Sequence, residues 1–134
     1  MSEFDWIAWL KHQAQSKISA RNDIIQGIGD DAAVCEVPTG MQLVISTDTL
    51  VSGVHFPEDT APIDIGYKAL AVNLSDIAAM GAEPCWLSLA ISMPEMNWDW
   101  LTQFAEGLID LAAEHGMQII GGDTTRGPLS ITIT

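Results

Sequence analysis

Aspartates beside glycines and hydroxyl side chains are the residues of this chain whose types and spacing could do chemistry. They occur in four stretches: "GIGDDAA" (27–33), "VISTDTL" (44–50), "NLSDIAAMG" (73–81) and "GGDTT" (121–125). Most fall in predicted turns or at predicted strand ends, where carboxylates from separate segments can converge. The candidate metal ligands are Asp30, Asp31, Ser46, Thr47, Asp48, Asp76 and Asp123.

These oxygen donors suit Mg²⁺, which takes a few carboxylates and keeps its other positions for water and substrate phosphate. Calcium could use the same oxygens, but the EF-hand spacing is absent, and zinc would need clusters of His or Cys. The chain has 5 basic and 18 acidic residues and a net charge of −13, which argues against a nucleic-acid-binding surface. An acidic excess also fits solvated helix faces that keep a protein soluble, so composition leaves both interpretations open.

Asp76 is the aspartate that fits a solvated acidic face least well. It lies in an Ala-rich helical stretch, with Asn73 on the same face and Ala69 and Met80 nearby. We expect this face to be poorly solvated, so that Asp76 needs a hydrogen-bonding partner, a positive charge or a metal.

The stretch "IIGGDTTRGP" (119–128) combines a Gly-rich turn with Asp123. Backbone N–H groups of such a turn can approach an anion, yet the spacing of a P-loop is absent. Arg126 could contact phosphate or make a structural salt bridge on the same turn. His55, in a loop that Gly53 loosens, is a further candidate, although a lone His is more often structural.

Length and cysteine usage restrict the class of protein. A chain of 134 residues is long enough for one domain with a core. Cys35 and Cys85 are isolated and lack C-x-x-C spacing, which fits a reducing cytoplasm. With no basic and apolar leader at the N-terminus and no apolar run near 18 residues, we predict a soluble, unexported, cytoplasmic protein.

Hydrophobic periodicity predicts the elements that position these residues. A first helix starts at a capping box of Ser2 and Asp5, and longer helices cover 63–80 and 98–115, the last between an Asn97 cap and Gly116. The stripe of the 63–80 helix is Tyr67, Leu70, Leu74 and Ile77. Strands are predicted at 32–37, 41–47, 85–93, 117–120 and 129–134.

This order of elements predicts an α/β (α+β two-layer) fold, a mixed sheet with helices on one face. The open face would carry apolar residues and need a cover, either further chain or a second copy. The last strand stops in mid-alternation at Thr134, which suggests the first domain of a longer polypeptide.

Together, "GIGDDAA", "STDTLVSGVHF", "GYKALAVNLSDIAAMGAEP" and "GGDTTRGP" resemble the N-terminal domain of the thiamine-monophosphate kinase family, within the AIR-synthase-like superfamily. The resemblance covers residues 25–134 and extends loosely to the first helix. It implies ATP-dependent phosphorylation of thiamine monophosphate to thiamine diphosphate by direct transfer of the γ-phosphoryl group. No general base is assigned, because phosphoryl transfer depends mainly on positioning and charge neutralisation.

The resemblance also implies roles for single residues and an assembly. It implies that Asp31, Ser46, Thr47, Asp48, Asp76 and Asp123 hold several Mg²⁺ ions around the ATP phosphates, that His55 contacts thiamine monophosphate, and that Gly122 and Asp123 lie at the ATP site. Residues 1–134 would be the ATP- and Mg²⁺-binding dimerisation domain, with sheets of two copies closing a barrel. The family's C-terminal domain is absent from this sequence, so we expect the fragment alone to be inactive.

Two alternatives remain. One is another ATP-using member of the superfamily, such as an aminoimidazole ribonucleotide synthetase, a selenophosphate synthetase or a hydrogenase maturation factor. The other is a non-catalytic dimerisation module whose acidic turns bind cations.

Overall fold

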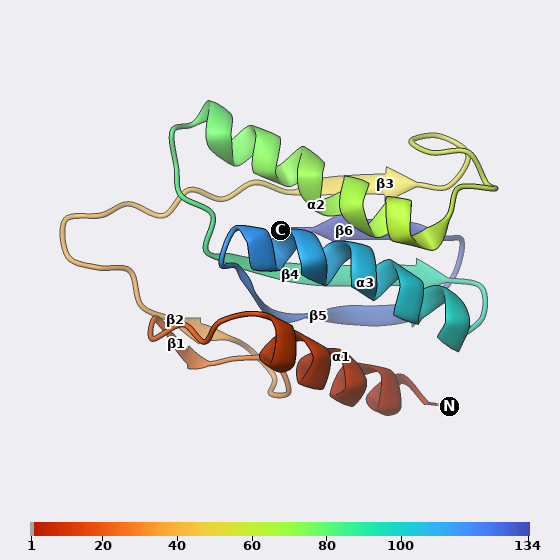
Figure 1. Cartoon of the computed structure of the whole chain (residues 1–134), viewed down its shortest axis with the longest axis horizontal. Helices are drawn as coiled ribbons and strands as arrows, with labels where there is room; N and C mark the ends of the chain where they lie inside the picture. Colours follow the sequence, from red (N-terminus) through yellow and green to blue (C-terminus); the bar gives the residue numbers. More distant parts are fainter. Residues whose placement is uncertain (1) are drawn as a thin grey trace.

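The computed structural model describes residues 2–134 and shows two layers, a mixed sheet with helices packed on one face (Figure 1). The elements are, in chain order, α1 (Glu3–Lys17), β1 (Ile24–Gln26), β2 (Val34–Cys35), β3 (Asp48–Val51), α2 (Pro62–Ala79), β4 (Trp86–Met93), α3 (Trp98–Glu114), β5 (Gln118–Arg126) and β6 (Ser130–Ile133). The predicted two-layer mixed fold is confirmed. Within the described residues, every helix is too short or too polar to cross a membrane.

The main sheet has the strand order β3-β6-β4-β5, in which β4 and β5 are parallel and β6 is antiparallel to both β3 and β4. The strands β1 and β2 form a separate two-stranded sheet. The prediction that all strands share one sheet is therefore wrong for β1 and β2. The strand predicted at 32–37 is only Val34–Cys35 (β2), and the sequence analysis missed its partner β1.

Local capping signals fix the helix boundaries. The Ser2 hydroxyl accepts from the Asp5 N–H while the Asp5 carboxylate accepts from the Ser2 N–H, which confirms the capping box. Asn97 Oδ1 accepts from the Trp100 N–H and starts α3. Just after α3, Gly116 has a φ of 64°, a conformation that stops a helix and favours glycine.

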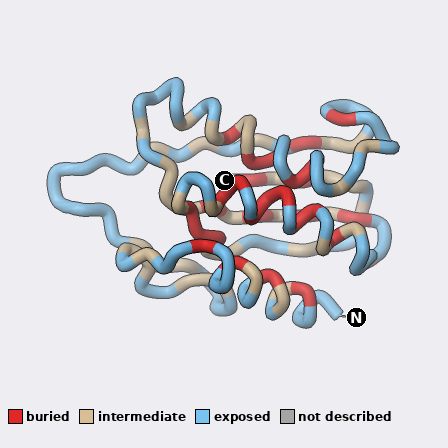
Figure 2. Tube along the Cα trace, viewed as in Figure 1, coloured by how far each residue is buried: buried red, intermediate tan, exposed pale blue. Residues whose placement is uncertain are grey.

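The core lies between the helices and one face of the sheet (Figure 2). The alternate residues Leu87, Leu89, Ile91 and Met93 of β4 are buried, as predicted. The helices α2 and α3 cross closely, because a Cβ on Gly66 would meet the Phe104 carbonyl oxygen at 2.1 Å and one on Gly107 the Ile63 oxygen at 2.0 Å. In α2, Leu70 is buried as predicted, but Tyr67 is 55% exposed and does not belong to the apolar stripe.

The other face of the main sheet is open and mostly polar. Neighbouring strands place Thr49 beside Thr132, Thr132 beside Ala90, and Ala90 beside Asp123, with a hydrogen bond of 2.8 Å between the two threonine hydroxyls. The prediction of an apolar open face is therefore wrong over the paired strands, where small and hydroxyl side chains need no apolar cover.

The strand predicted at 41–47 was also wrong. This segment precedes β3 as an unpaired stretch, and the ladder with β6 begins only at Asp48, opposite Ile133. Its large apolar side chains are exposed: Met41 is 65%, Leu43 54% and Ile45 69% accessible. An alternating pattern describes the side chains of such a segment, but it does not create a neighbouring strand.

Candidate functional site

Asp48 and Asp76 form the centre of the candidate site. Asp48 is the first residue of β3, whereas the sequence suggested that it follows a strand. Its side chain lies on the same sheet face as buried Leu50 and reaches Asp76 near the end of α2. The two carboxyl groups share a hydrogen bond, which raises the pKa of Asp48 above its usual range, with burial and the Asp76 charge adding to the shift.

One hydroxyl group lies beside this pair of carboxylates, and a second lies on the opposite face of the sheet. The Ser46 hydroxyl donates to Asp76 Oδ2 at 3.3 Å, whereas Thr47 Oγ1 donates on the open face to Thr134 Oγ1 at 3.0 Å, just after the end of β6. The structure thus brings together Ser46, Asp48 and Asp76 from the predicted ligand set, with Thr47 adjacent in the chain. Two hard carboxylates and a hydroxyl form a donor set that a divalent cation could use.

Asp76 itself is exposed, so the expectation of a poorly solvated face was wrong for this residue. The buried polar side chain on α2 is Asn73, one turn earlier, which is 6% accessible. Met80, expected on the same face, is 70% exposed. The helix therefore turns Asn73 toward the core and presents Asp76 at its rim, where solvent and ligands can reach it.

The remaining predicted ligands lie elsewhere. Asp30 and Asp31 occupy the exposed turn between β1 and β2, where the Asp31 N–H donates to Asp30 Oδ1 at 2.8 Å. Asp123 is inside β5, not beyond a strand as predicted, because β5 continues to Arg126. It lies on the open face, opposite to the face that carries Asp48, and its strand is separated from β3 by about 14 Å, three strand spacings of roughly 4.8 Å.

Accordingly, no group of three His, Cys, Asp or Glu side chains converges on one cation position within residues 2–134. The described chain supplies a two-carboxylate centre and two outlying acidic groups. A ligand that brings its own oxygens, such as a phosphate, would be needed to connect them.

Gly122 has a structural reason for being glycine. Its φ is 152°, and a Cβ at this position would lie 1.7 Å from the Leu89 carbonyl oxygen of the neighbouring strand. The residue follows a register irregularity between β4 and β5 at Leu87 and Ser88. The close approach of β5 to β4 beside Asp123 therefore requires a residue without a side chain.

His55 lies in the turn after β3, at the opposite end of this strand from Asp48. Its Nδ1 accepts a hydrogen bond of 2.9 Å from the Val51 N–H, and its carbonyl oxygen accepts from Lys68 Nζ on α2. Since Nδ1 accepts, the neutral ring carries its proton on Nε2. This exposed edge of the ring is therefore a donor, and Lys68 lies next to the same turn.

Arg126 is not paired with Asp123. Its Nε donates to the Pro94 carbonyl at 3.2 Å, which ties the end of β5 to the turn after β4. The ion pair of the described chain is Arg21 with Asp23, at 2.8 Å. Sequence reasoning missed this contact, although the Arg-x-Asp spacing in a polar loop was a usable signal.

Comparison with known proteins gives two matches in sequence and two in structure. A family model described as "AIR synthase related protein, N-terminal domain" matches residues 29–134. A curated "Thiamine-monophosphate kinase" of Escherichia coli (strain K12) is 56% identical over 115 residues, which are 86% of this chain and 35% of that protein.

Solved structures agree with this match. The crystal structure of thiamine-monophosphate kinase from Stenotrophomonas maltophilia K279a has a TM-score of 0.84 and 50% identity, covering 99% of this chain and 41% of that one. A structure described as "AaThiL complexed with AMPPCP and TMP" has a TM-score of 0.68 and 29% identity, covering 98% of this chain and 40% of the other. The chain thus spans 35–41% of the length of these relatives.

Proposed function

Since the chain belongs to the family of AIR synthase related proteins and matches the N-terminal domain of that family, we propose that it is the first domain of a thiamine-monophosphate kinase. The complete enzyme transfers the γ-phosphoryl group of ATP directly to thiamine monophosphate and forms thiamine diphosphate. The 56% identity to the E. coli kinase and the likeness to a relative in complex with AMPPCP and TMP support this substrate pair. The observation that carries the proposal is the Asp48–Asp76 contact beside Ser46.

The donor chemistry of this contact fits Mg²⁺. A nearby cation would stabilise the ionised forms of two carboxyl groups in contact, one of which has a raised pKa, and Ser46 adds a neutral oxygen. We assign Ser46, Thr47, Asp48 and Asp76 as ligands of Mg²⁺ ions that this domain holds. Asp30, Asp31 and Asp123 are assigned to ions whose coordination is completed by the ATP phosphates. When bound, Mg²⁺ would neutralise charge on two phosphate groups that otherwise repel each other.

Other residues of the chain position the substrates. His55 presents the Nε2 proton to a phosphate oxygen of thiamine monophosphate, because its Nδ1 is held by the Val51 N–H. Gly122 and Asp123 form part of the ATP site at the open sheet face, where Gly122 allows the close approach of β5 to β4 that positions Asp123. We assign no general base, because phosphoryl transfer depends mainly on positioning and charge neutralisation.

The test is a competition assay on the longer polypeptide that contains this chain. It is offered ATP and Mg²⁺ with thiamine monophosphate, aminoimidazole ribonucleotide precursor or selenide as the acceptor. We expect turnover with thiamine monophosphate; preference for another acceptor would assign the chain to a different enzyme of the family. Robust turnover by residues 1–134 alone would contradict the assignment of a single incomplete domain.

The finer features of the assembly belong to the same proposal. Two copies pair their sheets across a two-fold axis and close a barrel, and the protein works in the cytoplasm, which the free thiols Cys35 and Cys85 support. The open face that would line such a barrel carries Ser and Thr side chains. Light scattering on the longer polypeptide tests the dimer, and a monomer at micromolar concentration would contradict it.

A further inference from the structure

The turn after β3 satisfies its own backbone donors. Every backbone N–H group from residue 51 to residue 55 has an acceptor within the described chain, at 2.8 to 3.2 Å. The Val51 carbonyl accepts two of these bonds, and His55 Nδ1 and the carbonyls of Leu129 and Phe56 accept the other three. The Phe56 side chain is buried and anchors the turn in the core. A nest of free N–H groups, the backbone form of an anion site, is therefore absent from this described turn.

Two side-chain donors remain available at the same turn. His55 Nε2 carries the ring proton, because Nδ1 accepts from the Val51 N–H. Lys68 reaches over from α2, and its ammonium group donates to the His55 carbonyl oxygen. Within residues 2–134 this carbonyl is the acceptor that Lys68 contacts, and an ammonium group has three N–H bonds. Lys68 therefore keeps donors for a ligand next to the exposed His55 ring.

The charge of Lys68 is not neutralised by a carboxylate. The salt bridge of the described chain joins Arg21 to Asp23, although the whole sequence has 18 acidic and only 5 basic residues. Asp64 lies four residues before Lys68 on α2, a spacing that permits an ion pair, yet the lysine contacts the turn instead. An uncompensated cationic donor beside a neutral N–H donor suits an anionic oxygen ligand, since charge-assisted hydrogen bonds are the strong ones.

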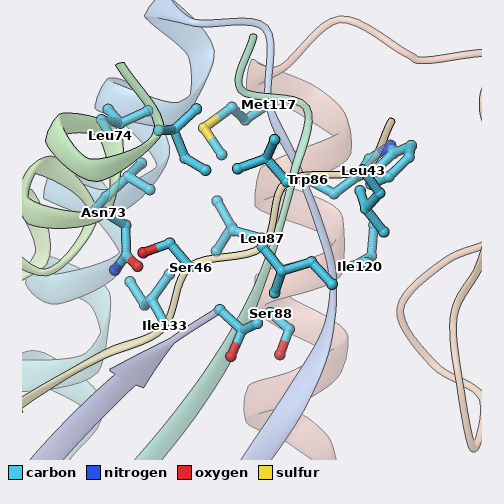
Figure 3. Close-up of a pocket in the computed structure, with 15 residues that line it drawn as sticks. Leu43, Ser46, Asn73, Leu74, Trp86, Leu87, Ser88, Met117, Ile120 and Ile133 are labelled. Carbon is cyan, nitrogen blue, oxygen red and sulfur yellow. The ribbon is translucent and has the colours of Figure 1, made fainter. Parts of the chain in front are cut away.

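The helix that carries Lys68 also leads to the carboxylate pair. Asp76 follows Lys68 by two steps of four residues, which places both on one side of α2, about 12 Å apart along the helix. Between them, Asn73 lies beside Ser46, whose hydroxyl donates to Asp76 (Figure 3). One helix therefore carries a cationic group in its first half and a candidate Mg²⁺ ligand near its end.

We propose that Lys68 is a substrate-binding residue, which together with His55 holds the phosphate group of the acceptor. This inference rests on the proposed function, in which the acceptor is thiamine monophosphate. The His55 Nε2–H donates to one phosphate oxygen and the Lys68 ammonium group to another, while Lys68 stays on the His55 carbonyl. The pair selects a phosphate monoester over the free alcohol, because the alcohol would leave the ammonium group without an anion.

Inorganic phosphate tests this site without turnover. The longer polypeptide is labelled with ¹⁵N-histidine, and the His55 Nε2 resonance, assigned by its loss in His55→Gln, is followed by NMR as phosphate is added without Mg²⁺. We expect a saturable shift in the parent and at least about tenfold weaker phosphate binding in Lys68→Met. Lys68→Arg keeps the charge and should recover most of the affinity. Lys17→Met, at an exposed lysine in the last turn of α1, is the matched control and should bind as the parent does.

Steady-state kinetics then connects the site to the reaction. Lys68→Met should raise the KM for thiamine monophosphate about tenfold or more and leave kcat and the KM for ATP nearly unchanged, because it removes binding energy common to ground state and transition state. Lys68→Gln keeps an N–H donor for the His55 carbonyl but no charge, and it should behave like Lys68→Met. A parent-like KM in Lys68→Gln would reduce Lys68 to a support of the turn and overturn the proposal.

The phosphate titration separates failure of this inference from failure of the proposed function. Phosphate that leaves the His55 resonance of the parent unshifted, or binds equally well to Lys68→Met, would overturn the role of Lys68 even if the parent phosphorylates thiamine monophosphate. A parent that uses a different acceptor would contradict the proposed function, and a Lys68-dependent shift of His55 would then still establish the phosphate site.

Discussion

Two partly buried aspartates of this chain meet opposite surroundings. Asp23 accepts hydrogen bonds from Arg21 Nε at 3.0 Å, Arg21 Nη2 at 2.8 Å and Trp86 Nε1 at 3.1 Å. The Arg21 hydrogen bond, followed by that of Trp86, holds the pKa of Asp23 below its usual range despite burial. Asp48 instead faces the carboxyl group of Asp76, and its pKa is raised.

Under the proposed function, the difference separates a structural carboxylate from one that binds a metal ion. Asp23 connects the loop before β1 to β4, and Arg21 also reaches the Gly116 carbonyl at 2.9 Å, so this cluster joins three segments. The chain has only 5 basic residues, and none forms an ion pair with Asp48 or Asp76 in the described structure. Carboxylates left together without a cation are unfavourable for stability, which is typical of a site that binds one.

The largest expected effect is on turnover of the longer polypeptide. Asp48→Asn or Asp76→Asn should lower kcat with thiamine monophosphate by roughly 10²–10³-fold, because each removes a carboxylate charge that we propose holds Mg²⁺ at the phosphates. Asp110→Asn, on the exposed side of α3, is the matched control and should retain activity. Steady-state kinetics measures both, and near wild-type kcat in Asp48→Asn would assign the carboxylate pair no part in the reaction.

A smaller effect, on stability alone, is expected at the other aspartate. Asp23→Ala should lower the free energy of unfolding by about 1–3 kcal/mol, because it leaves Arg21 Nε, Arg21 Nη2 and the Trp86 N–H without their acceptor. Urea denaturation followed by tryptophan fluorescence measures this change. Asp110→Ala should stay within about 0.5 kcal/mol of the parent. A loss at Asp23 no larger than this control would remove its structural role.

The sequence predicted features that depend on residues close together in the chain, and it missed features that depend on contacts between distant segments. The α3 helix was placed within one residue, because Asn97 and Gly116 act locally. The contact between Asp48 and Asp76 joins residues from a strand and a helix, and only the packing of α2 against β3 creates it.

Strand pairing in the fold also depends on more than the alternation of apolar and polar residues in the sequence. The 41–47 pattern is that of a strand, yet pairing needs a neighbour, and the ladder with β6 starts at Asp48. Asp123 is an acidic residue in a recognisable motif, but its place on the open face follows from the parallel register of β5 with β4 after an irregularity. Residue types thus identified the candidate ligands, and the sheet determined which of them meet.

The smallest effect is the pH dependence, in which the two aspartates should act with opposite sign. A raised folded-state pKa means that Asp48 contributes stability below the ordinary value of 3.8, and that this contribution is lost as pH rises through its folded-state pKa. Asp23, with a lowered pKa, contributes stability above 3.8 that is lost as pH falls through its folded-state pKa. Thermal unfolding across this range measures both.

Substitution and metal addition isolate the Asp48 part of this profile. Asp76→Asn should remove the loss above pH 3.8, a change below about 1 kcal/mol for a solvent-accessible pair. At neutral pH, millimolar Mg²⁺ should raise the Tm of the parent chain slightly and leave Asp48→Asn unchanged, because a ligand stabilises only the state that binds it. An equal rise in Tm in both proteins would place Mg²⁺ elsewhere and leave the carboxylate pair as an ordinary acidic contact.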